Sequence, residues 1–119
     1  MSDNNVLSQS VLDYKRYEMK DHGGINWLIN LFISEIPNYI NQLQQAIASA
    51  DGEALHLAAH KFKGSCSNVG AIGMIALCEQ LEELGHAGEM EKATLMVASH
   101  LEKEVERLKN ALELEKQQD

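Results

Sequence analysis

The stretch AAHKFKGSCSNVGA, residues 58–71, holds the residues of this chain that could most readily carry chemistry. Lys63 follows His60 by three positions and Gly64 follows it by four, and residues at these spacings share one face of a helix. A histidine ring is largely neutral near pH 7 and has a nucleophilic nitrogen, while a lysine ammonium can stabilise a phosphoryl group. Together these residues predict a site at which histidine accepts and releases a phosphoryl group.

Gly64 is the least expected residue of this stretch. Glycine inside a helix costs about 1 kcal/mol relative to alanine, and an exposed position offers nothing to offset that cost. A missing side chain one turn from the imidazole leaves room for a bulky group to approach His60. An ordinary solvated surface is the simplest interpretation of an isolated histidine, and Gly64 argues against it.

The helical position of the stretch predicts which side chains face water. At 100° per residue, His60 lies roughly 150° from the centre of the apolar stripe of its helix. Lys63, Gly64 and Ser67 fall on the same outer face, whereas Lys61 falls on the other flank. The residues that could carry chemistry are therefore expected to be exposed.

Helices must hold this stretch in place, because apolar residues recur every three or four positions along most of the chain. Four long segments show this pattern: residues 25–47, 55–69, 74–84 and 93–112. Pro37 is expected to kink the first of them without dividing it, and Asp51 is expected to cap the second. A shorter helix should precede all four. The pattern predicts an all-α fold, an antiparallel up-down four-helix bundle with a short additional N-terminal helix.

A single domain is expected, because 119 residues suffice for one core and are too few for two. Apolar residues make up 45% of the chain and charged residues 24%, which is typical of a globular protein. We expect residues 10–115 to form the bundle domain, residues 1–9 a flexible N-terminus and residues 116–119 a C-terminal tail.

Charge and composition exclude several classes of function. The formal net charge of −8 argues against nucleic acid as a partner, because phosphate binding needs a basic surface. The chain has neither a basic leader nor about 18 consecutive apolar residues, so we expect no membrane insertion and a cytoplasmic location. Cys66 and Cys78 form no zinc-binding pair and are expected to be buried, reduced thiols. No GxxxxGK[ST] nucleotide motif is present.

The stretch resembles the histidine-containing phosphotransfer (HPt) domain, whose members carry the pattern H-x-x-K-G-x-x-x-x-x-G. This pattern is matched here by His60, Lys63, Gly64 and Gly70. The similarity extends over roughly residues 11–112 and implies a four-helix bundle with the histidine on its second helix. Phe62 stands where leucine or isoleucine is more common, which preserves an apolar contact.

The resemblance implies a role for each matching residue in a two-component phosphorelay. His60 would accept a phosphoryl group at Nε2 from the aspartyl phosphate of one receiver domain and pass it to the aspartate of another. Lys63 would stabilise the phosphoryl charge, and Lys61 would help to dock the acidic rim of the receiver. No cofactor is expected in this chain, because the receiver would supply the magnesium ion. We also expect a monomer without a nucleotide site, a carrier rather than an enzyme.

Access and positioning are expected to depend on Gly64, Ser67 and Glu82. Gly64 would provide clearance for the phosphoaspartate, and Ser67 shares its face. In several HPt domains a carboxylate or amide on the following helix bonds the other ring nitrogen, and Glu82 occupies that place here. A carboxylate that accepts from Nδ1–H would leave Nε2 as the nucleophile. The competing interpretation is that Glu82 belongs to a solvated acidic face.

Three other functions are compatible with a helical bundle. His56 and His60, four positions apart, could bind a metal ion with further ligands from His22, His86 or His100. Lys61 and Lys63 would repel such a cation, so we expect no metal site. A helical adaptor or inhibitor without chemistry is the main alternative, and the coincidence of His60, Lys63 and Gly64 argues against it. A conventional enzyme is disfavoured because a slim bundle fills its interior with side chains.

Overall fold

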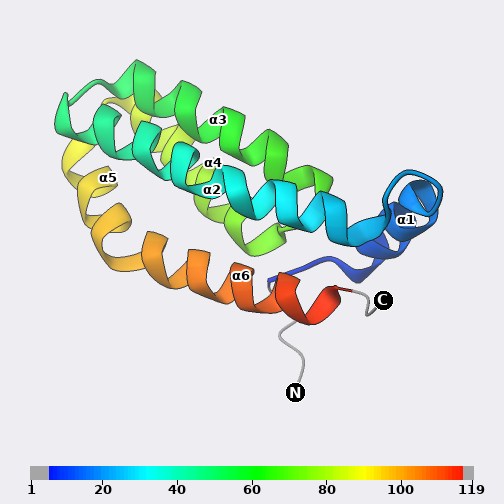
Figure 1. Cartoon of the computed structure of the whole chain (residues 1–119). Helices are drawn as coiled ribbons and strands as arrows, with labels where there is room; N and C mark the ends of the chain where they lie inside the picture. Colours follow the sequence, from blue (N-terminus) through cyan, green and yellow to red (C-terminus); the bar gives the residue numbers. More distant parts are fainter. Residues whose placement is uncertain (1–5, 117–119) are drawn as a thin grey trace.

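The computed structural model describes residues 6–116, and this part of the chain consists of helices joined by short loops, with no strand (Figure 1). The helical elements follow one another in this order: α1 (Gln9–Met19), α2 (Gly24–Ala48), α3 (Gly52–Asn68), α4 (Ile72–Ala87), α5 (Met90–Met96), η1 (Val97–Leu101) and α6 (Glu102–Glu115). The predicted all-α fold is confirmed.

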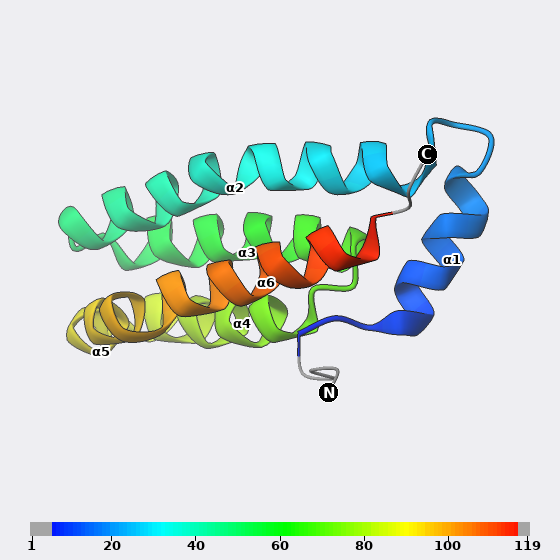
Figure 2. The same ribbon diagram turned by 60° about the horizontal axis from the view of Figure 1, so that its bottom comes forward.

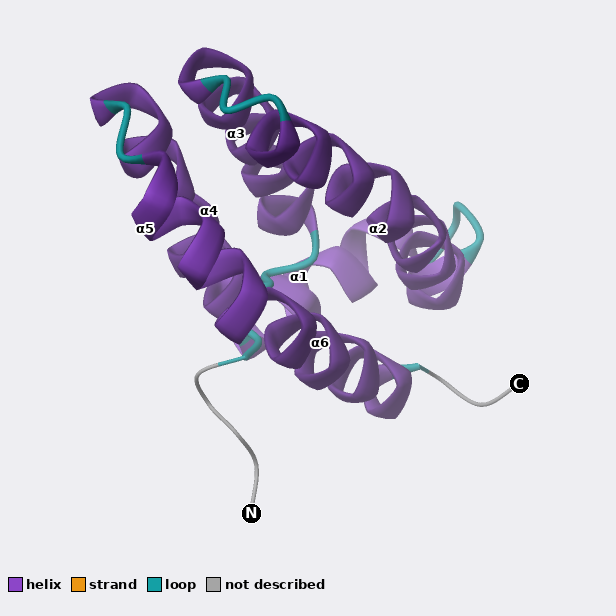
Figure 3. Ribbon diagram, turned by 90° about the vertical axis from the view of Figure 1, so that its left-hand side faces the viewer, coloured by secondary structure: helices purple, strands orange, loops and turns teal. Residues whose placement is uncertain are grey.

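Four long helical rods, formed by α2, by α3, by α4 and by the run of α5, η1 and α6, lie alongside one another. The short helix α1 crosses one end of them (Figures 1 and 2). α3 packs against both α2 and α4, and α6 closes the bundle against α4 and α2. Connections of two or three residues join α2 to α3, α3 to α4 and α4 to α5, so successive rods run antiparallel. Figure 3 shows the same arrangement viewed toward the end where the connections to α3 and α5 lie.

The fourth rod is a single continuous helical run from Met90 to Glu115 that contains a π-helical turn, η1. Ala93, Leu101 and Val105 are all buried, although they are eight and four residues apart. An α-helix repeats every 3.6 residues, so spacings of four would carry these side chains away from the core. The wider π turn absorbs the extra residue and keeps all three side chains facing inward.

The helix that carries His60 buries one conventional apolar face. Leu55, Ala59, Phe62 and Cys66 of α3 are each fully buried and join a core built from all the rods. Cys66 and Cys78 are free thiols within that core, as expected. A hydrogen bond with Cys78 and burial both raise the pKa of the Cys66 thiol, so this group is a poor nucleophile at neutral pH.

The predicted N-cap of α3 and the predicted continuity of α2 through Pro37 are confirmed. Asp51 caps α3, because its carboxylate accepts a hydrogen bond of 3.0 Å from the backbone nitrogen of Ala54. α2 continues through Pro37 as one element. The end of α4 is set by Gly88, whose φ of 74° lies in the left-handed region that favours glycine.

The expectation of a flexible N-terminus over residues 1–9 is wrong for its last four residues. Val6 and Leu7 are 2% and 8% exposed, so they pack into the core. Ser8 caps α1, and its backbone nitrogen donates a hydrogen bond of 2.8 Å to the carbonyl oxygen of Gly70. The bundle domain therefore begins before residue 10. Residues 1–5 lie outside the described part, and of the predicted tail over 116–119 only Lys116 is described.

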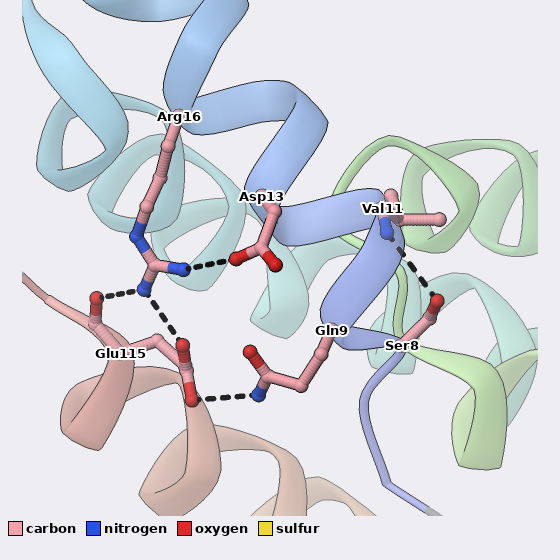
Figure 4. A network of polar contacts seen from close by, with 6 residues as sticks. All are labelled: Ser8, Gln9, Val11, Asp13, Arg16 and Glu115. Atoms are coloured by element: carbon pink, nitrogen blue, oxygen red, sulfur yellow. Dashed lines mark hydrogen bonds and ion pairs between the residues drawn. The ribbon is translucent and has the colours of Figure 1, made fainter.

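α1 is fastened to the C-terminal end of α6 by one carboxylate (Figure 4). Arg16 Nη2 lies 2.6 Å from Glu115 Oε1 and 2.7 Å from its backbone oxygen, and Gln9 donates to Glu115 Oε2 at 2.9 Å. Arg16 also pairs with Asp13 at 3.3 Å. These bonds hold α1 across the end of the bundle.

None of the helices within residues 6–116 has the length and apolar character that crossing a membrane requires.

Candidate functional site

His60 lies at the middle of α3 and projects away from the core. Its side chain is 65% exposed, whereas the preceding residue, Ala59, is fully buried. The predicted outward orientation of His60 is therefore confirmed. Ser67 and Gly64 are exposed on the same helix, and Lys63 is partly exposed.

The carboxylate of Glu82, on α4, bridges His60 and Lys63 of α3. Glu82 Oε2 lies 3.3 Å from His60 Nδ1, and Glu82 Oε1 lies 2.7 Å from Lys63 Nζ. Only 13% of the Glu82 side chain is exposed, so this carboxylate is not part of a solvated acidic face. One partly buried group thus holds the two cationic or protonatable side chains of the site.

Electrostatics keep this bridge charged near neutral pH. Burial acts to raise the pKa of Glu82, but hydrogen bonds from Lys63 and His60 and the charges of both outweigh it, so the net pKa is lowered. The hydrogen bond to Glu82 raises the pKa of Lys63 against the opposing effect of desolvation. A carboxylate can only accept, so His60 Nδ1 must carry the proton in this contact. The other ring nitrogen, Nε2, is then unprotonated in the neutral ring.

A close approach of α3 and α4 brings Glu82 within reach of His60. A side chain at Gly85 would place its Cβ 2.6 Å from the backbone oxygen of Gly52, and one at Gly52 would place its Cβ 2.4 Å from the oxygen of Gly85. Only glycine fits at either position. Nearby, His56 Nδ1 donates to the backbone oxygen of Glu82 at 3.0 Å. These contacts hold α3 and α4 close together within one helical turn of Glu82.

Space around Gly64 is open. A Cβ built on Gly64 meets no heavy atom of another element within 4 Å, so nothing within residues 6–116 covers the position one turn beyond His60. Ser67 donates its hydroxyl to the backbone oxygen of Lys63 at 3.1 Å, which ties it to its own helix. The predicted clearance beside His60 is present in the geometry.

Lys61 lies on the other flank of α3, as predicted, and faces α2 across an open groove of about 500 Å³. His60, Gln42 and Gln45 also line this groove. Lys61 is exposed and lies away from the Glu82 bridge, so the structure separates it from Lys63.

The sequence did not predict two contacts near the site. Tyr39 of α2 stacks on Phe62 with 4.9 Å between ring centroids, and its hydroxyl bonds Ser65 and lies 3.4 Å from Glu35 Oε2. The sequence feature that could have indicated the Tyr39 contacts is its hydroxyl group within the apolar stripe of α2. The contact between Gly52 and Gly85 also escaped, because two glycines near helix ends are equally typical of helix caps.

The remaining histidines are spread over the molecule. His56 packs against His86 with 5.7 Å between ring centroids, and His100 Nδ1 lies 2.7 Å from the hydroxyl of Ser99. Within residues 6–116 no group of three or more histidine, cysteine, aspartate or glutamate side chains is placed to hold a metal ion. His22 is exposed.

Comparison with known proteins decides the family. The model of the Hpt domain family matches residues 28–111, which is most of the chain. The chain belongs to the Hpt domain family. The resemblance predicted from the motif around His60 is thus confirmed, and His60, Lys63, Gly64 and Glu82 all lie inside the matched range.

A solved structure supports the same assignment. The chain is similar to histidine-containing phosphotransfer protein B (HptB) from Pseudomonas aeruginosa PAO1, with a TM-score of 0.86 and 27% sequence identity. The match covers 95% of this chain and 96% of the HptB chain. No curated protein matches the sequence. Hpt domains are phosphocarriers that interact with receiver domains in phosphorelays, so this chain is assigned to histidine phosphotransfer.

Proposed function

We propose that His60 of this Hpt protein accepts a phosphoryl group at Nε2 from the phosphoaspartate of one receiver domain and passes it to the aspartate of another. The observation that carries the proposal is the contact of 3.3 Å between His60 Nδ1 and Glu82 Oε2. This contact occupies one ring nitrogen and leaves Nε2 as the nucleophile of an exposed side chain.

The transfer step follows from the protonation of the ring. The lone pair of Nε2 attacks the phosphorus atom, an Nε2–P bond forms, and the bond between phosphorus and the aspartate oxygen breaks. The electron pair of the broken bond stays on the leaving aspartate carboxylate. The proton on Nδ1 remains in its hydrogen bond to Glu82, which stabilises the positive charge that develops on the ring. The reverse sequence loads the next receiver.

Lys63 supports this step through its charge. A phosphoryl group bound to histidine carries about −1.5 to −2 charges, and an ammonium one helical turn away can stabilise it. Lys63 is already held by Glu82 at 2.7 Å, so it is positioned before a partner arrives. Its raised pKa keeps it charged throughout the neutral range.

The receiver would approach over the exposed parts of α2 and α3. Gly64 leaves open space beside His60, and Lys61 lies on the flank toward α2, where it can meet the acidic rim of a receiver. The magnesium ion of the reaction would come with the receiver. We place this exchange in the cytoplasm, with the Hpt protein acting as a monomer that releases each partner.

Transfer of label tests the proposal directly. Receiver domains from the same organism are charged with radiolabelled acetyl phosphate and mixed with the purified Hpt protein. We expect the protein to gain phosphate that is labile in acid and stable in base, which is typical of phosphohistidine. His60→Gln should gain none. Uptake by His60→Gln equal to that of the unmodified protein would overturn the proposal, and no uptake from any receiver would favour a binding-only adaptor.

A further inference from the structure

A second groove lies on a part of the surface that phosphotransfer does not use. It encloses about 310 Å³ between α4 and the rod formed by η1 and α6. Four residues of α4 line one wall and four of the run formed by η1 and α6 line the other: Gly73, Ala76, Leu77 and Gln80, and His100, Lys103, Glu104 and Arg107. We call it the basic groove.

The basic groove and the phosphotransfer site lie on different sides of α4. Gln80 lines the groove and Glu82 faces His60, and residues two positions apart in a helix point about 200° apart. A molecule bound in the groove would therefore leave His60 accessible. The two surfaces can be occupied at the same time.

The charge of the groove is opposite to that of the chain. The chain carries a formal net charge of −8, yet Lys103, Arg107 and the titratable His100 all line this one groove. The acidic residue among them is Glu104, which is 13% exposed and bonds Arg107 at 3.0 Å. Lys103 is exposed and forms no ion pair within residues 6–116. This local excess of positive charge favours an anionic ligand.

The spacing of the cations indicates the shape of that ligand. His100 and Arg107 are seven residues apart, which corresponds to about 10 Å along a helix, so the three side chains follow the length of the groove. Ala76 on the opposite wall is small and exposed, so it leaves room for another chain to approach. Several carboxylates spaced along a polypeptide fit this arrangement better than a free phosphate.

The π turn contributes one of the ligand-facing side chains. His100 lies within η1, and its Nδ1 is 2.7 Å from the hydroxyl of Ser99, so the far ring nitrogen can face a ligand. π turns are rare and often occur at functional sites. In this chain the turn keeps Leu101 in the core and His100 on the groove at the same time.

We propose that the basic groove binds a short acidic segment of a partner protein while His60 exchanges phosphate with a receiver domain. Carboxylates of the segment would pair with Lys103 and Arg107, and the backbone of the segment would lie against Ala76. The groove would then act as a second attachment point that raises the local concentration of a partner. Binding of the segment does not depend on the proposed function, whereas its use during phosphate exchange rests on that function.

Binding of a fluorescein-labelled peptide of six glutamates, followed by anisotropy at low salt, tests the proposal. We expect Lys103→Glu to weaken binding by about tenfold, because an exposed attraction becomes a repulsion. Lys109→Glu, a matched charge reversal on α6 outside the groove, should leave binding within about twofold. In nitrogen-15 NMR spectra the peptide should shift the amides of residues 73–80 and 100–107.

Other results would overturn the proposal. Equal weakening by Lys103→Glu and Lys109→Glu would indicate general attraction to positive charge. Peptide-induced shifts centred on His60, Lys61 and Lys63 would place the acidic ligand at the phosphotransfer face. Full displacement of the peptide by an equal concentration of inorganic phosphate, or tighter binding of single-stranded DNA, would show that the groove does not select an acidic segment.

Discussion

Glu82 reaches the Nδ1 atom of His60 from the neighbouring helix, with 3.3 Å between the carboxylate oxygen and the ring nitrogen. The side chain of Glu82 is 13% exposed and that of His60 is 65% exposed, so a partly buried carboxylate holds an exposed imidazole ring. The orientation of the ring therefore depends on how closely α3 and α4 pack. The carboxylate and the glycines near it each lead to a separate test.

Glu82→Ala should slow phosphotransfer by about tenfold, because the ring loses the group that fixes its tautomer and orientation. Glu82→Gln keeps an oxygen that can accept from Nδ1 and should recover part of the rate. The measurement is the rate of label uptake from a charged receiver, together with the nitrogen-15 shifts of the His60 ring, which report the tautomer. Glu83→Ala, an exposed neighbour, is the control. A Glu82→Ala rate equal to that control would remove Glu82 from the site.

The contacts of Glu115 with Arg16 and Gln9, which join α6 to α1, should make the free energy of unfolding depend on pH in the acid range. Burial acts to raise the pKa of Glu115, but the hydrogen bonds from Arg16 and Gln9 and the charge of Arg16 lower it overall from 4.5. Because the folded pKa is below that of the unfolded chain, this stabilisation is complete above about pH 4.5 and is lost as the pH falls through the folded value.

Glu115→Gln tests this dependence, since it keeps hydrogen-bonding atoms and removes the charge. We expect it to lower the free energy of unfolding by about 1 kcal/mol at pH 7 and by much less at pH 3. Urea unfolding at both pH values measures the difference between the two proteins. A difference that is the same at pH 3 and pH 7 would mean that the charge of Glu115 does not act through Arg16.

The apolar periodicity was enough to predict the helices, but it did not predict the π turn. The spacings of four between Val97, Leu101 and Val105 exceed the period of an α-helix, and this excess is the signal of η1. A seven-residue repeat fitted to the whole segment averages spacings of three and four, so it hides the extra residue of the π turn. The buried Val6 and Leu7 were also missed, because two apolar residues before Ser8 are too few to show a period.

The outward face of His60, Gly64 and Lys63 follows from helical geometry alone, since one helix fixes their relative positions. The resemblance singled out Glu82, but the sequence could not exclude that Glu82 lies with Glu79 and Glu83 on a solvated face, because the rotation of α4 against α3 depends on contacts between distant residues. The contact between Gly52 and Gly85 sets that rotation and brings Glu82 inward. Contacts between helices depend on residues far apart in the sequence, so a local sequence pattern does not predict them.

Gly64→Ala should separate stability from function. Nothing of another element lies within 4 Å of a Cβ at this position, so alanine fits the free protein and should raise the free energy of unfolding by about 0.5–1 kcal/mol. The same methyl group narrows the space through which a phosphoaspartate reaches His60, so transfer should slow. Urea unfolding and the rate of label uptake measure the two effects.

Asn110→Ala is the control for Gly64→Ala, because it also replaces a weak helix former at an exposed helical position, far from His60 in the sequence. It should raise stability and leave the transfer rate unchanged. If Gly64→Ala also transfers at the unmodified rate, the glycine is not needed for access.

Gly85→Ala should have the opposite effect on stability, although the substitution is chemically the same. Its Cβ would lie 2.6 Å from the backbone oxygen of Gly52 and 2.9 Å from the backbone nitrogen of His56, and neither backbone atom can move without moving α3. We expect the free energy of unfolding to fall by about 1–3 kcal/mol, as for overpacked cores.

The same substitution should also slow transfer, because separating α3 from α4 draws the Glu82 carboxylate away from His60 Nδ1. The His60 ring shifts of Gly85→Ala should therefore move toward those of Glu82→Ala, which a purely global loss of stability would not cause. Leu108→Ala, a core truncation on α6, is the control that lowers stability without touching the contact between α3 and α4. If Gly85→Ala is less stable but keeps the ring shifts and the transfer rate of the unmodified protein, the close approach of the two helices does not position Glu82.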